Sequence, residues 1–63
     1  SRLNPMAQLY RIEEETTSGW HVTEPTDVKL TKEQASKRLE ALLAEGYNPA
    51  RLRAIPDTAQ STN

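Results

Sequence analysis

Apolar residues recur at intervals of three and four between residues 31 and 45, and polar residues fill most positions between them. This spacing predicts one amphipathic helix with a single buried stripe. The stripe consists of Ala35, Leu39, Leu42 and Leu43. An isolated helix of this length is marginal in water, so it requires packing against the rest of the chain or against another chain.

Both ends of this helix carry residues that favour a boundary. Thr31 can accept a hydrogen bond from a free backbone N–H of the first turn, and Gln34 completes the spacing of a capping box. Gly46 readily adopts the left-handed conformation that ends a helix. The Asn48-Pro49 pair then prevents any continuation.

Three short segments have the composition of β-strands, at residues 6–13, 20–23 and 51–55. The turn-rich residues 16–19 join the first two into a hairpin, with Gly19 in a left-handed position of a bulged loop. Pro56 ends the third strand. We expect one face of the hairpin to pack under the helix, and this face consists of Tyr10, Ile12, Trp20 and Val22.

The element order β–β–α–β predicts an α+β fold, a two-layer sandwich with one helix on one face of a small three-stranded sheet. The third strand can pair with either the second or the first strand. The other sheet face is uncovered, and it carries Leu9, Arg11, His21, Thr23 and either Arg51 with Arg53 or Leu52 with Ala54. Because such a face with exposed edges favours pairing with a second copy, we expect a homo-oligomer, most simply a homodimer.

The chain is short enough for one domain only, with 63 residues. Residues 1–5 precede the single methionine, Met6, and we interpret them as an expression-tag remnant. Residues 6–56 form the predicted α+β domain. Residues 57–63 contain no large apolar side chain, so we expect a disordered tail there.

Composition excludes several classes of site. The chain has no cysteine, which excludes disulfides and thiolate metal sites. Its net charge of −1 gives no overall electrostatic attraction to nucleic acid or to an anionic membrane. No apolar run approaches the length of a membrane span and no secretory signal is visible, so we expect a cytoplasmic protein.

No catalytic set emerges from the sequence, and we expect no enzyme. His21 is the single histidine of the chain, and no oxyanion motif accompanies the hydroxyl groups near it. The consecutive acids at 13–15 do not have the spacing of metal ligands. We therefore interpret them as the solvated end of the hairpin. With only two glycines there is no phosphate-binding loop, so the sequence predicts neither metal nor cofactor.

Two functions remain. The favoured one is a small non-enzymatic protein-interaction module that self-associates and docks another protein through its open face or edge. Its candidate contact residues are Arg11, His21, Arg51 and Arg53. The alternative is a nucleic-acid-binding accessory protein that uses the same face, with Tyr10 or Trp20 stacking on bases. The two differ in salt dependence, because phosphate contacts weaken steeply as salt rises.

The chain also resembles a group of small proteins of marine cyanophages and their picocyanobacterial hosts. The resemblance rests on YRIEE followed by a Gly-Trp hairpin, on LTKEQ at the helix start, and on EGYNPARLRAIPD at the end. It spans residues 10–57 and so covers most of the chain. It implies a phage or cyanobacterial origin and a cytoplasmic setting, and it brings no active site with it.

Overall fold

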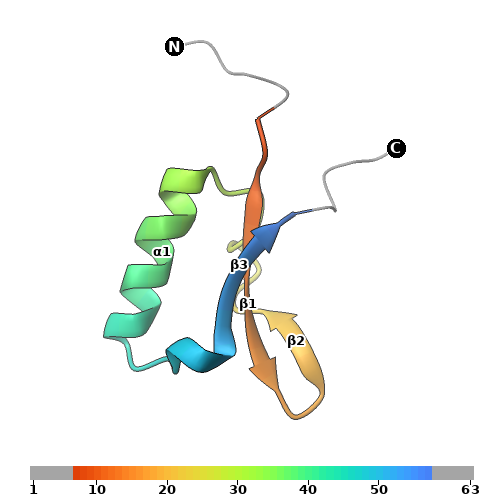
Figure 1. The fold of residues 1–63 in the computed structure, drawn as a ribbon, viewed down its shortest axis with the longest axis vertical. Helices are drawn as coiled ribbons and strands as arrows, with labels where there is room; N and C mark the ends of the chain where they lie inside the picture. Colours follow the sequence, from red (N-terminus) through yellow and green to blue (C-terminus); the bar gives the residue numbers. More distant parts are fainter. Residues whose placement is uncertain (1–6, 58–63) are drawn as a thin grey trace.

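The computed structural model describes residues 7–57, and these form a three-stranded antiparallel sheet with one helix on one face (Figure 1). In chain order the elements are β1 (Tyr10–Thr16), β2 (Gly19–Val22), α1 (Lys32–Ala44), the 3-10 turn η1 (Pro49–Arg51) and β3 (Leu52–Pro56). The strand order is β2-β1-β3. The α+β class and the β–β–α–β order are confirmed, and β3 pairs with the first strand. The tag prediction for residues 1–5 lies outside the described residues.

Local interactions set the limits of α1 as the sequence predicted. Thr31 is the N-cap, and its side chain and that of Gln34 form the capping box. At the other end Gly46 has a φ of 107°. The Gly46 N–H donates to the Leu43 carbonyl (3.0 Å) and the Tyr47 N–H donates to the Leu42 carbonyl (3.1 Å), which is the Schellman pattern.

The buried stripe of α1 is narrower than its sequence period indicates. Ala35 and Leu42 are buried, Leu39 is half-buried, and Leu43 is 42% exposed. The helix lies over β1 and β3, while β2 extends away from it (Figure 1). Because the helix covers only these two strands, Leu43 lies outside the covered strip.

The predicted core face of the hairpin is wrong for β2. In the observed register Glu13 pairs with Val22 and Glu15 pairs with Trp20. Cross-strand partners share a face, so Trp20 and Val22 lie on the opposite side of the sheet from Ile12. The cause is the hairpin turn: Thr16 pairs with Gly19, which leaves a loop of two residues. A shift of one residue in register turns every side chain of a strand to the other face.

The third strand follows the same alternation. Ile12 pairs with Ala54, and Glu13 pairs with Arg53. Ala54 therefore faces the helix, together with Tyr10 and Ile12. Arg53 lies on the open face. Of the two alternatives left open for this strand, the one with Arg53 outward is realised.

Three buried carboxylates accompany a very small apolar core. Only Ile12, Ala35 and Leu42 are fully buried apolar residues among residues 7–57. The buried acids are Glu13, Asp27 and Asp57, with 6%, 3% and 1% exposure. Each carboxylate accepts a hydrogen bond from an arginine. Ion pairs in this fold thus connect elements that the apolar core is too small to join alone.

Asp57 corrects the predicted tail, because this residue belongs to the folded unit. Its N–H donates to the Leu9 carbonyl (2.9 Å), and its carboxylate accepts from the Lys29 N–H (2.8 Å) and from Arg11 Nη1 (3.4 Å). Lys29 has a φ of 53°, a left-handed conformation that is unfavourable for a side chain of its size. The Asp57 carboxylate stabilises that conformation. Residues 58–63 of the predicted tail lie outside the described residues.

Asp27 performs a similar role between β2 and α1. Its carboxylate accepts hydrogen bonds from Arg38 Nε (2.8 Å) and Thr23 Oγ1 (2.6 Å), and its carbonyl accepts from the Ile12 N–H (3.0 Å). The hydrogen bond with Asp27 raises the pKa of the Arg38 guanidinium, against a smaller opposing effect of burial. Asp27 thus joins the connection between β2 and α1 to the helix through Arg38 and to the sheet through Ile12.

Candidate interaction surface

The sheet face opposite α1 is covered by no element among residues 7–57 (Figure 1). Alternation along the three strands places both apolar and charged side chains there, namely Arg11, Glu13, Glu15, Trp20, Val22, Arg53 and Ile55. We call this set the open face. Val22 is 37% exposed, while Trp20 and Ile55 are half-buried.

An arginine–glutamate–arginine cluster occupies the middle of the open face. Arg11 Nε donates to Glu13 Oε2 (2.8 Å), and Arg53 donates to Glu13 Oε1 through Nη2 (2.7 Å) and Nε (3.0 Å). Burial alone would raise the pKa of the Glu13 carboxyl, but the hydrogen bonds and charges of the two arginines together hold that pKa below its ordinary value. The hydrogen bond with Glu13 is also the largest cause that raises the pKa of Arg11. The predicted solvated role of the acids at 13–15 is therefore wrong for Glu13.

The Arg53 guanidinium also stacks on Trp20, 4.0 Å from the ring centroid. This is a cation–π geometry. One guanidinium thus neutralises the buried Glu13 and covers part of the indole. Trp20 is thus held on the open face by a contact within the chain, and it remains half-buried there.

We predict that Glu13 makes stability depend on acid pH. Its folded-state pKa is lowered, so below its ordinary value of about 4.3 the unfolded chain binds a proton that the folded chain resists. Stability is therefore full above that value and is lost as the pH falls through the folded-state pKa. Urea unfolding at several values between about pH 6 and pH 3 measures this.

The matched variant for this prediction is Glu13→Gln. It should be less stable than the parent chain near neutral pH, and its stability should change less over the acid interval. An identical pH dependence in the two proteins would show that Glu13 is not the responsible group.

The four predicted contact residues lie in three separate places. Arg11 and Arg53 lie together on the open face, both bonded to Glu13. His21 pairs with Glu14, so it lies on the opposite face, at the exposed end of β2. Arg51 is in η1, beside the C-terminal end of α1. Their role as contacts stays a prediction, and sequence reasoning missed Trp20 and Val22 as surface residues because it assigned them to the core.

The hairpin end holds a serine–histidine pair. Ser18 Oγ lies 3.0 Å from His21 Nε2, and Thr16 Oγ1 lies 3.2 Å from Ser18 Oγ. All three residues are exposed. Among residues 7–57, no side chain hydrogen bonds the other imidazole nitrogen, and a nucleophile–base pair of this kind needs such an orienting group. The same part of the chain contains no cluster of His, Cys, Asp or Glu suited to a metal ion.

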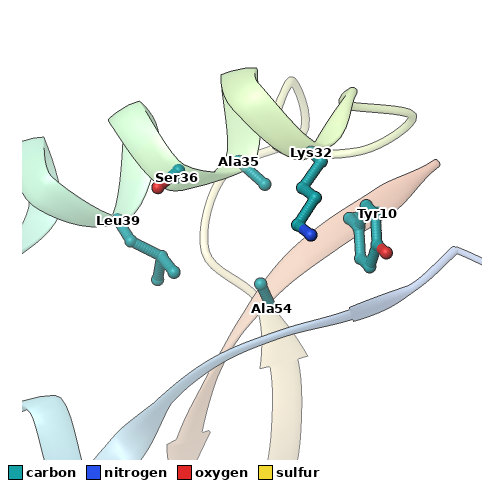
Figure 2. Close-up of a pocket in the computed structure, with 6 residues that line it drawn as sticks. All are labelled: Tyr10, Lys32, Ala35, Ser36, Leu39 and Ala54. Carbon is teal, nitrogen blue, oxygen red and sulfur yellow. The ribbon is translucent and has the colours of Figure 1, made fainter.

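A hollow of about 220 Å³ lies between α1 and the sheet, beside β3 (Figure 2). It is lined by Tyr10, Lys32, Ala35, Ser36, Leu39 and Ala54. Small-molecule sites usually enclose about 300–1,000 Å³. This hollow therefore has the size for a single side chain. We call it the helix–edge pocket.

No family model, curated protein or solved structure matches this chain. In the part of the chain that the structure describes, no helix is both long and apolar enough to cross a bilayer.

Proposed function

We propose that this chain is a non-enzymatic protein-interaction module that self-associates through its open face. The supporting observation is the position of Trp20, Val22 and Ile55 outside a very small core. Domains of this size often gain stability by association, and Trp is enriched at the centres of interfaces. A second copy would remove these three side chains from water.

Charge on the open face is compatible with a two-fold arrangement. Glu15 lies near the hairpin end of β1, and Arg11 lies towards its other end. Glu15 forms no ion pair among the described residues. If two open faces stack with their β1 strands antiparallel, the Glu15 side chain of each copy approaches the Arg11 end of β1 in the other copy. Such complementary charges would fix the register of the pair.

The solution mass of the protein over a range of concentrations tests this proposal. We expect a dimer by light scattering after size exclusion, and we expect Val22→Lys to shift it to monomer. Val22 is already 37% exposed, so this substitution should leave the monomer folded. Leu43→Lys is the matched control, because Leu43 is 42% exposed on α1, away from the open face.

A strict monomer at all concentrations would overturn self-association. The role of the open face would be overturned if the Leu43→Lys variant were monomeric and the Val22→Lys variant remained a dimer. That result would place the interface on the helix. Circular dichroism of both variants shows that each remains folded.

Nucleic-acid binding is the second candidate, because Trp20 shares the open face with Arg11 and Arg53. Against it, both arginines already bind Glu13, and Arg53 covers part of the indole. Binding of single-stranded oligonucleotides at two salt concentrations separates the two functions. Affinity that falls steeply with salt would favour nucleic acid.

The setting of the protein is also a proposal. The resemblance to cyanophage and picocyanobacterial proteins supports action in the cytoplasm of a cyanobacterial cell, where a host or phage protein would be the partner. Expression of a tagged chain in such a cell, followed by fractionation, would test this location.

A further inference from the structure

The outer edge of β3 presents free backbone groups. β3 is at the end of the sheet, and the Asp57 N–H donates to the Leu9 carbonyl. In an antiparallel ladder hydrogen-bonded pairs alternate with non-bonded pairs, so Arg53 and Ile55 bond to β1 as Asp57 does. The backbone groups of Leu52, Ala54 and Pro56 therefore point outward.

This edge has more acceptors than donors. The Leu52 N–H donates to the Pro49 carbonyl within η1, and Pro56 has no N–H. Ala54 is left with a free N–H and a free carbonyl, and Leu52 and Pro56 add one carbonyl each. Among residues 7–57 no other segment pairs with this edge.

The shortage of free N–H groups on the outer edge of β3 determines which kind of strand can pair with it. Two copies of this edge contain only two free N–H groups, one from each Ala54, so they can form at most two hydrogen bonds in any register. A foreign strand has an N–H at every residue other than proline. Lying antiparallel with one residue opposite Ala54, it would donate to all three carbonyls and accept from the Ala54 N–H.

The helix–edge pocket lies on the same side as the side chain of that central residue. Cross-strand partners point to the same face, so the residue opposite Ala54 directs its side chain towards α1. Figure 2 shows Ala35, Leu39 and Lys32 extending from the helix towards Ala54 and Tyr10. The pocket has room for one large apolar side chain, and no acid lines it.

Charge specifies a second position of the foreign strand. Lys32 lies at the Tyr10 end of the pocket and forms no ion pair among the described residues. Tyr10 pairs with Pro56, so the strand residue opposite Pro56 lies at this end. In an antiparallel strand this residue comes two positions before the central one. An acidic side chain there would approach the Lys32 ammonium.

We propose that β3 and the helix–edge pocket bind an extended segment of another protein by strand addition, with an acidic residue two positions before a large apolar residue. Backbone hydrogen bonds would supply most of the affinity, and the pocket would supply selectivity, as in other strand-addition sites. This surface is separate from the open face, so the proposal does not depend on self-association.

An NMR titration of the labelled full chain tests this inference. The probe is a capped peptide, Thr-Thr-Glu-Thr-Leu-Thr-Thr-Thr. We expect the Ala54 amide to shift, and its hydrogen exchange to slow, as the peptide binds. Replacing the peptide leucine by alanine, or methylating its backbone nitrogen, should each weaken binding by about tenfold.

A charge exchange supplies the matched control. Lys32→Glu should weaken binding of the probe and should favour a peptide in which lysine replaces the glutamate. Lys32 is the first residue of α1, where an acid suits the helix dipole, so the variant should fold. Lys37→Glu, on an exposed helix position outside the pocket, should leave both affinities unchanged.

Three results would overturn the proposal: no perturbation of Ala54 at millimolar peptide, unchanged affinity after N-methylation, or perturbation confined to the open face. Protection of the Ala54 amide that rises with protein concentration alone would assign the edge to a second copy. Val22→Lys should bind the probe as the parent chain does, so failure of self-association remains distinguishable from failure of this site.

Discussion

Replacing Arg11 by leucine should lower the free energy of unfolding by about 3 kcal/mol. Arg11 bonds two carboxylates that are almost fully buried, Glu13 at 6% exposure and Asp57 at 1%. Without the guanidinium, both charges remain in the interior with fewer partners. Glu13 keeps Arg53 and Asp57 keeps the Lys29 N–H, so the loss should lie at the lower end of the range for broken buried pairs.

Urea unfolding, monitored by circular dichroism, measures this loss of stability. Arg51→Leu is the matched control, because Arg51 is exposed and forms no ion pair among residues 7–57. Its effect should stay within about 0.5 kcal/mol. Equal losses in the two variants would show that a general change of charge, and not the buried cluster, controls stability.

Replacing Leu42 by aspartate should abolish folding. Leu42 is fully buried with Ile12 and Ala35, and its carbonyl accepts the Tyr47 N–H that ends α1. An unpaired polar group in an apolar interior costs several kcal/mol, and a charged group costs more. A domain of this size rarely has more than about 3–5 kcal/mol of stability in total.

Leu39→Asp should be far milder, although the helical period treats Leu39 and Leu42 alike. Leu39 is half-buried and lines the helix–edge pocket, where a carboxylate can reach water. Far-UV circular dichroism should show a folded protein for Leu39→Asp and an unfolded one for Leu42→Asp. A folded Leu42→Asp protein would show that the core is assigned to the wrong residues.

The helix could be predicted almost to the residue because its signals are local. Thr31 and Gln34 bond each other's backbone across three residues, and Gly46 ends the helix through bonds to the turn that precedes it. These interactions form in the same way whatever the rest of the chain does.

The faces of the hairpin could not be predicted with the same certainty, because they depend on the number of residues in one loop. Residues 16–19 are all favourable in turns, so several registers have similar local chemistry. The observed pairing of Thr16 with Gly19 places Trp20 on the open face, where Arg53 stacks on it. That stacking joins two residues 33 positions apart in the sequence, and no local sequence pattern predicts such a contact.

The buried acids were missed for a related reason. A lone aspartate after Pro56, or three consecutive glutamates, usually indicates solvent-exposed chain. Asp57 is buried because the Lys29 N–H and the Arg11 guanidinium both reach it. Glu13 is buried because Arg53 of the neighbouring strand β3 and Arg11, two residues before it in β1, both reach it. Arg53 and Glu13 are so distant in sequence that their pairing becomes visible only once the strand order is known.

The hydrogen bond between Asp57 and Leu9 also brings the first and last parts of the described segment side by side. A segment whose ends meet can be joined there by a short linker and opened elsewhere, since circular permutation and domain insertion are tolerated where such ends are close. The exposed turn at Thr17 and Ser18 is the natural place for new ends. The same geometry allows this unit to be placed within a surface loop of a larger protein without separating the loop's two ends.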